Sequence, residues 1–170
     1  MIQKKICLMG SFAVGKTSLV RRFVENMFSD KYLTTLGVKI SKKIVNIQLE
    51  DVTILIWDIG GEDLFPQTKL TYLRGMSGYL LVVDKTRTST LEIVIDIQKK
   101  VRGTFPDVPY ILLENKTDLT GQWDIEDATI EKMQHEGWEI MKTSAKTGLG
   151  VEEAFNCLAA KMLKKTITQS

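Results

Sequence analysis

The sequence has few cysteines, no long apolar run and no excess of charge of one sign. Its two cysteines, Cys7 and Cys157, lie in separate apolar segments without pairing or metal-ligand spacing, so we expect buried free thiols in a reducing compartment. No apolar stretch approaches the roughly 18 residues of a membrane-spanning helix. The 23 basic and 21 acidic residues nearly balance, which disfavours non-specific nucleic-acid binding. These absences favour a cytoplasmic protein with no nucleic-acid partner.

Signals of lipid attachment and of chain division are missing too. Ile2 stands where N-myristoylation requires a glycine, and Thr166–Ser170 contain no cysteine for prenylation, so we expect no direct lipid anchor. Any membrane contact would then go through a partner protein. Because there are no internal repeats, no proline- or serine-rich linkers and no long charge blocks, residues 1–170 are expected to form one domain.

The apolar residues that are present predict strands covered on both faces. Four continuous runs have the length of strands: Ile6–Met9, Ile54–Trp57, Tyr79–Val83 and Tyr110–Leu113. Val45, Ile47 and Leu49 instead alternate with polar residues, which is typical of a strand nearer an edge. The step Glu50-Asp51 after them suggests a hairpin turn and one antiparallel pair.

Segments with helical periodicity separate these strands: Ser18–Glu25, Leu91–Val101, Ile125–Gln134 and Val151–Met162. Alternating strands and helices predict an α/β fold with a parallel sheet, helices on both faces and ligands bound at the carboxyl ends of the strands. In Leu91–Val101 we expect Ile95 in the core stripe. Ile93 and Ile97 then share a second face, which marks either a protein contact or a wide stripe.

The first predicted strand ends in a phosphate-binding motif. Residues Gly10–Thr17, GSFAVGKT, match GxxxxGK[ST] in full between a strand and a helix. Such a loop turns backbone N–H groups toward a phosphate, while Lys16 neutralises phosphate oxygens and Thr17 offers a hydroxyl to Mg²⁺. We call Gly10–Thr17 the phosphate loop.

A second motif selects the base. Residues Asn115–Asp118 form an NKxD element after a buried strand. The Asp118 carboxylate can accept both the ring N1–H and the exocyclic amine of guanine, whereas adenine has an unprotonated N1. Asn115 is expected to tie neighbouring loops, and the Lys116 stem to lie over the base. The two motifs together predict a guanine-nucleotide site.

On these motifs the chain resembles a Ras-superfamily small GTPase over essentially its whole length. Further elements fit: Thr35-Leu36-Gly37 resembles switch I, Trp57–Glu62 resembles the switch II motif, and Ser144–Lys146 resembles the second base loop. Rab-, Rho- and Arf-like features are mixed, so the subfamily stays open. The resemblance implies a P-loop NTPase three-layer sandwich with a six-stranded, mostly parallel sheet.

The resemblance also implies roles for individual residues. Nucleotide contacts would come from Gly10, Phe12, Ala13, Val14, Gly15, Lys16, Thr17, Ser18, Phe28, Thr35, Gly61, Asn115, Lys116, Asp118, Leu119, Ser144, Ala145 and Lys146. Mg²⁺ would be held by Thr17, Thr35 and Asp58, and catalysis would involve Lys16, Gly61 and Glu62. The amide of Gly61 would meet the γ-phosphate.

Two residues depart from the family pattern. The family's catalytic glutamine corresponds to Glu62, whose carboxylate can only accept hydrogen bonds and repels the γ-phosphate, so we expect slow intrinsic hydrolysis. The alternative is that Glu62 acts as a general base. Phe12 either obstructs an arginine finger supplied by an activating protein or packs outward near Phe65.

The function expected is a GTP-binding switch with Mg²⁺-dependent hydrolysis to GDP. Effector, exchange factor and GTPase-activating protein would bind through switch I (Phe28–Val38) and switch II (Ile59–Arg74). A hydrophobic triad of Ile40, Trp57 and Tyr72 either adds to this surface or packs the sheet against a helix. We expect a monomer. The rival is a GTP-binding scaffold with little or no turnover, and an ATP-dependent kinase is disfavoured by Asn115–Asp118.

Overall fold

A six-stranded sheet forms the centre of the molecule, with strand order β2-β3-β1-β4-β5-β6. The computed structural model describes residues 2–31, 35, 37–60 and 70–169, with 166–169 as backbone alone. The strands are β1 (Ile2–Gly10), β2 (Val38–Ile47), β3 (Glu50–Ile59), β4 (Gly78–Asp84), β5 (Tyr110–Asn115) and β6 (Ile140–Lys142). β2 pairs antiparallel with β3 and every other pair is parallel. The predicted mostly parallel sheet is confirmed.

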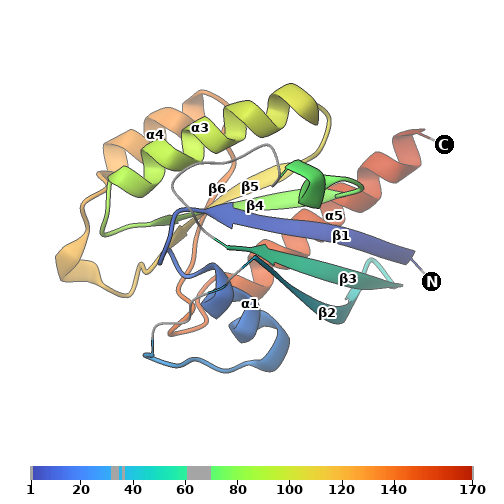
Figure 1. Cartoon of the computed structure of the whole chain (residues 1–170), viewed down its shortest axis with the longest axis horizontal. Coiled ribbons are helices and arrows are strands. Elements are labelled where there is room, and N and C mark those ends of the chain that lie inside the picture. Colours follow the sequence, from blue (N-terminus) through green and yellow to red (C-terminus); the bar gives the residue numbers. More distant parts are fainter. Residues whose placement is uncertain (1, 32–34, 36, 61–69, 170) are drawn as a thin grey trace.

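Helices cover both faces of this sheet (Figure 1). They are α1 (Lys16–Glu25), α3 (Ser89–Thr104), α4 (Asp127–His135) and α5 (Val151–Gln169), with the short 3₁₀ turns η1 (Thr71–Leu73) and η2 (Thr120–Gln122). α1 and α5 pack on one face, where the rings of Phe23 and Phe155 stack 4.1 Å apart. α3 and α4 pack on the other. The three-layer sandwich expected from the alternation of strands and helices is confirmed.

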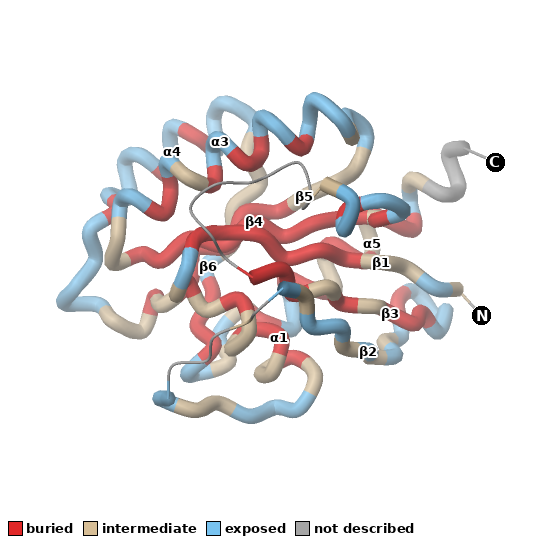
Figure 2. Tube along the Cα trace, viewed as in Figure 1, coloured by how far each residue is buried: buried red, intermediate tan, exposed pale blue. Residues whose placement is uncertain are grey.

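The central strands carry the core because both of their faces are covered. All seven residues of β4 are buried, and β1 is buried from Ile6 to Gly10 (Figure 2). Burying such continuous apolar strands contributes roughly 25 cal/mol per Å² of apolar surface removed from water. No helix within the described ranges combines the length and apolarity needed to cross a membrane. Because the carboxyl ends of β1 and β5 are buried, the loops that follow them start from packed strands.

The β2–β3 hairpin turns earlier than expected. Ile47 pairs with Glu50, so the turn consists of Gln48 and Leu49, whose φ angles are 53° and 69°. Two consecutive residues with positive φ make the two-residue turn that matches the twist of a hairpin. The prediction that Leu49 continues the strand and that Glu50-Asp51 turns is wrong, and Leu49 is 95% exposed.

Two further expectations about burial need correction. In α3, Ile97 is 4% exposed and belongs to the core, whereas Ile95 is 40% exposed. Of the two alternatives for Ile93 and Ile97, the protein contact is wrong and the wide stripe is confirmed, because Ile97 packs on the sheet beside Val94 and Val101 and the partly buried Ile93 packs against the same cluster. Cys7 is buried as expected, but the thiol of Cys157 is only partly buried.

Candidate functional site

A pocket opens at the carboxyl edge of the sheet, where the loops after β1, β5 and β6 meet. Its wall consists of Phe12, Ala13, Gly15, Lys16, Thr17, Ser18, Phe28, Ser29, Asp30, Lys31, Thr35, Asp58, Asn115, Lys116, Asp118, Leu119, Ala145 and Lys146. The phosphate loop, the NKxD element and the second base loop are thus brought together, although more than a hundred residues separate the first from the last. This is the edge at which doubly wound sheets bind their ligands.

Some of the predicted site residues do not line the pocket. Gly10 and Val14 stand behind its wall, where their carbonyls accept hydrogen bonds from Lys16 and Asn115. Ser144 also stands behind the wall and contacts Asp118. Gly61 and Glu62, two of the three residues predicted to be catalytic, lie outside the described residues, as does Phe65.

The phosphate loop is shaped to turn its amides into the pocket. Lys16 Nζ donates to the carbonyls of Gly10 and Ser11, both at 2.9 Å, and so bridges the loop from inside. Gly15 has a φ of 100°, and a Cβ at this position would lie 2.3 Å from Asn115 Nδ2. Only glycine fits both the conformation and the space.

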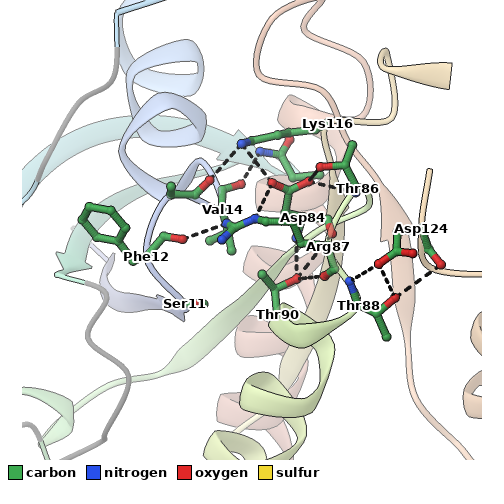
Figure 3. Close-up of polar contacts among 12 residues, drawn as sticks. Ser11, Phe12, Val14, Asp84, Thr86, Arg87, Thr88, Thr90, Lys116 and Asp124 are labelled. Atoms are coloured by element: carbon green, nitrogen blue, oxygen red, sulfur yellow. Dashed lines mark hydrogen bonds and ion pairs between the residues drawn. The ribbon is translucent and has the colours of Figure 1, made fainter. Parts of the chain in front are cut away.

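Donors from the end of β5 hold the loop from outside. Asn115 Nδ2 donates to the carbonyl of Val14 at 2.9 Å, and Lys116 Nζ donates to that of Ala13 at 2.8 Å. Figure 3 shows Lys116 reaching across to the loop beside Asp84. Because each peptide unit is planar and trans, a carbonyl held outward leaves the following N–H facing the opposite way, into the pocket. Such a concave set of N–H groups attracts anions.

The base end of the pocket is organised around Asp118. Ser144 Oγ donates to Asp118 Oδ1 at 2.7 Å and fixes the orientation of the carboxylate. Asn115 Oδ1 accepts from Ala145 N at 3.3 Å and from Thr143 Oγ1 at 3.2 Å, so this buried amide joins the second base loop to the phosphate loop. The expectation that Asn115 ties neighbouring loops agrees with this geometry.

Three oxygen-bearing side chains meet beside the phosphate loop. Thr17 Oγ1 donates to Asp58 Oδ2 at 2.5 Å and also contacts Thr35 Oγ1, which lies 3.2 Å from the same carboxylate oxygen. Asp58 is 1% exposed, and its Oδ1 is buried with no hydrogen-bond partner among the described residues. Hydroxyl and carboxylate oxygens are the ligands that Mg²⁺ prefers. The donor set and the unpartnered oxygen fit that ion.

The two switch segments contact one another close to this oxygen cluster. Gly60 N donates to the carbonyl of Gly37 at 2.7 Å. A Cβ on Gly60 would lie 2.5 Å from the carbonyl oxygen of Thr35, so the approach requires glycine. A ligand that binds Thr35 therefore also affects the position of Gly60 at the start of switch II.

The predicted hydrophobic triad is on the surface. Ile40 is 54% and Tyr72 is 38% exposed, and Ile40 pairs with the partly buried Trp57 across β2 and β3. Lys5 Nζ lies 3.6 Å from the centre of the Trp57 ring and donates to the Tyr72 carbonyl. Ile40 and Tyr72 are therefore exposed, whereas Trp57 is partly buried and packs against the core cluster beneath it.

A buried ion pair lies directly behind the NKxD element. Lys85 Nζ is 2.5 Å from Glu114 Oε1 and 2.8 Å from Asp127 Oδ1, and the side chains of Lys85 and Glu114 are at most 1% exposed. Burial by itself would lower the pKa of Lys85, but the two carboxylates outweigh it and raise that pKa. The pair joins Lys85, the residue after β4, to the carboxyl end of β5 next to Asn115.

Sequence reasoning missed several residues around the pocket. Ser29–Lys31 line it; they lie within the predicted switch I (Phe28–Val38) but were not among the predicted nucleotide contacts. Asp84 is 2% exposed and lies 3.0 Å from Lys116 Nζ. Burial would raise the pKa of Asp84, yet hydrogen bonds from Thr86 and Lys116 hold that pKa below its ordinary value. Its position at the carboxyl end of a predicted central strand was the available signal.

Sequence similarity to known proteins extends over most of the chain. The sequence model of the Ras family matches residues 5–164. Ras-related protein Rab-4 of Dictyostelium discoideum is 37% identical over 153 residues, which are 89% of this chain and 75% of that protein. Ras-related protein Rab-13 of Bos taurus is 32% identical over 164 residues, 95% of this chain and 81% of that protein. The similarity therefore spans both walls of the pocket.

Proposed function

Because this chain belongs to the Ras family of small GTPases, we propose that it works as a guanine-nucleotide switch in which residues 1–170 act as one G domain. It binds Mg²⁺ with GTP or GDP in the pocket, and the nucleotide state controls which proteins it contacts. The observation that carries this proposal is that the phosphate loop and Asp118 line one and the same pocket. Each is suited to one end of a guanine nucleotide.

The polyphosphate end is held by the phosphate loop. The outward-held carbonyls of Ala13 and Val14 leave the following amides free to bind phosphate oxygens. Lys16, whose Nζ donates to the carbonyls of Gly10 and Ser11 across the loop, supplies positive charge there. The start of α1 adds the partial positive charge of a helix N-terminus to the same site.

The base end is read by Asp118. Ser144 engages Oδ1 of this carboxylate, which orients it so that it can accept the N1–H and the exocyclic amine of guanine. Phe28 and Lys116 line the pocket and offer apolar contact to the base. A base without these two donors leaves a carboxylate oxygen unpaired, which costs affinity.

Mg²⁺ would be held by the hydroxyls of Thr17 and Thr35 and by Asp58, and when bound it would neutralise phosphate charge. Thr35 comes from switch I, and Asp58 from the strand that leads into switch II. The contact of Gly60 with Gly37 joins the two segments. A γ-phosphate that holds Thr35 would therefore order both switches, and its loss would release them.

Hydrolysis is proposed to be slow without help. Gly61 and Glu62 follow Gly60 directly in the sequence, and the Gly61 amide would meet the γ-phosphate. The carboxylate of Glu62 cannot donate a hydrogen bond and adds negative charge where charge already accumulates. If Glu62 instead acts as a general base, replacing it with a neutral residue should slow hydrolysis.

Single-turnover hydrolysis of GTP by the wild type and Glu62→Gln separates these two roles. A faster Glu62→Gln variant supports the repulsion account, because glutamine restores a neutral donor and acceptor. A slower variant contradicts it and favours the general base. Lys16→Met, which should bind nucleotide poorly, is the control for activity that does not come from this pocket.

A scaffold that keeps GTP bound is the second candidate, favoured by Phe12 and Glu62. The Phe12 side chain lines the pocket and is 48% exposed, so a benzyl group occupies the rim by which an external arginine would enter. Identification of the nucleotide that copurifies with the protein decides between the two. GTP that persists with Mg²⁺ and releases no phosphate supports the scaffold, whereas GDP supports the switch.

Partner proteins are proposed to bind through the switches and the surface formed by Ile40, Trp57 and Tyr72. Exposed aromatic and aliphatic side chains of this kind are typical of interface cores. The effector, the exchange factor and the GTPase-activating protein would all use this region, in the cytoplasm and without nucleic acid. GTP-dependent capture of a partner, lost in Ile40→Asp but retained in the hairpin control Leu49→Asp, tests this assignment.

A further inference from the structure

An arginine from the loop after β4 reaches the phosphate loop. Arg87 Nη2 donates to the carbonyl of Phe12 at 2.8 Å, and Arg87 Nε lies 3.1 Å from Asp84 Oδ2 (Figure 3). The backbone N–H of Arg87 also donates to the Asp84 carbonyl at 2.9 Å, which fixes the loop that carries it. Arg87 does not line the pocket, so it contacts the loop from behind.

Arg87 completes a row of outside anchors. The carbonyls of three consecutive residues, Phe12, Ala13 and Val14, accept from Arg87, Lys116 and Asn115 respectively. Holding the Phe12 carbonyl outward fixes the plane of the peptide that it shares with the Ala13 N–H. The Ala13 amide is therefore aimed inward by Arg87, in a residue whose φ of 60° is uncommon for alanine.

One buried carboxylate orients two of these anchors. Asp84 Oδ2 lies 3.1 Å from Arg87 Nε and 3.0 Å from Lys116 Nζ, while Asp84 Oδ1 accepts from Thr86. The guanidinium is suited to this position because it can face a carboxylate and a carbonyl at once with fixed geometry. The fixed carboxylate keeps the guanidinium directed at the loop.

We propose that Arg87 is a positioning residue for polyphosphate binding, which sets the direction of the Ala13 amide through the Phe12 carbonyl. This inference rests on the proposed nucleotide site and adds to it a residue that acts without touching the nucleotide. Its loss should weaken the binding of phosphates and leave the choice of base unchanged, because Asp118 is oriented by Ser144 and not by Arg87.

The test compares Arg87→Met with Thr88→Val in titrations with GDP, a non-hydrolysable GTP analogue and inosine diphosphate. Thr88 is the matched control, because its hydroxyl donates to Asp124 Oδ2 at 2.7 Å in the same loop and makes no contact with the phosphate loop. We expect Arg87→Met to lose about tenfold in affinity for both guanine nucleotides, as for one charge-assisted hydrogen bond of a partly exposed group. The ratio of GDP to inosine diphosphate affinity should stay at the wild-type value. Arg87→Lys should recover only a small part of the loss, because an ammonium cannot face Asp84 and the Phe12 carbonyl with the same fixed geometry.

Three results would overturn the inference. One is an Arg87→Met variant that binds GDP as tightly as the wild type; another is an altered base ratio. The third is a Thr88→Val variant that loses as much GDP affinity as Arg87→Met, since the loss would then come from a change anywhere in this loop and not from the contact of Arg87 with the Phe12 carbonyl. A wild type that binds no guanine nucleotide would instead contradict the proposed function itself.

Discussion

Replacing Asn115 with alanine should loosen the whole pocket, because this one amide joins its three loops. Asn115 is 1% exposed. It donates to the Val14 carbonyl and accepts from Thr143 Oγ1 and from the Ala145 amide. The substitution deletes all three hydrogen bonds and leaves two backbone groups without this partner.

The expected magnitude follows from those three contacts. A hydrogen bond contributes about 1 kcal/mol net, and a buried group left without a partner costs roughly 1–3 kcal/mol. The free energy of unfolding should therefore fall by about 3 kcal/mol, a large part of the 5–15 kcal/mol typical of a domain. If the nucleotide binds only the state in which Asn115 joins the three loops, its affinity should fall by up to about two orders of magnitude.

Chemical denaturation and displacement of a fluorescent GDP measure the two effects. Asn46→Ala is the control, because Asn46 makes an exposed hydrogen bond to Asp51 in the hairpin and should change neither quantity. Asn115→Asp should bind GDP no better than Asn115→Ala, since a carboxylate oxygen would then face the Val14 carbonyl. The reasoning is refuted if Asn115→Ala binds GDP within threefold of the wild type.

Three more outcomes are expected. Glu114→Ala should lower the free energy of unfolding by about 3–5 kcal/mol, because it leaves the buried Lys85 ammonium with only one carboxylate partner. A double variant, Lys85→Met with Glu114→Leu, should recover most of that loss in the same denaturation assay. Asp84 has a lowered pKa in the folded state, so its contribution to stability is present above the unfolded-state pKa of about 4 and is lost as the pH falls through the folded-state pKa. Asp84→Asn should therefore be less stable than the wild type at neutral pH and should lose less stability on acidification. Equal acid-denaturation curves for the two proteins would argue against this role of Asp84. Chelation of Mg²⁺ should accelerate GDP release from the wild type much more than from Thr17→Ala, as followed by fluorescent-nucleotide dissociation, and equal acceleration would remove Thr17 from the metal site.

The architecture was largely predictable because continuous apolar runs and helical stripes are produced by burial itself. The four central runs became β1, β3, β4 and β5. The short strand Ile140–Lys142 has no such signal, since a three-residue edge strand is defined by its partner β5 rather than by its own pattern. Ile95 and Ile97 were interchanged because chemically similar residues on one helix differ only in the exact rotation of the helix on the sheet.

The candidate site was predictable where chemistry demands a fixed spacing and unpredictable where it does not. Gly15 and Lys16 follow from a continuous motif. Arg87 acts through the Phe12 carbonyl, which any residue would present, and Asp84 acts through Arg87 and Lys116, so no spacing rule reveals either residue. Ser144 was identified as a contact, but its place behind Asp118 depends on how β6 lies against β5.

The most direct test of the account is the base preference of Asp118→Asn. Guanine offers two donors to this carboxylate, whereas xanthine carries a carbonyl in place of the exocyclic amine, and an asparagine amide can donate to that carbonyl. We predict that the wild type binds GDP in preference to xanthosine diphosphate and that Asp118→Asn reverses the order. A variant that still prefers GDP would contradict the assignment of the pocket.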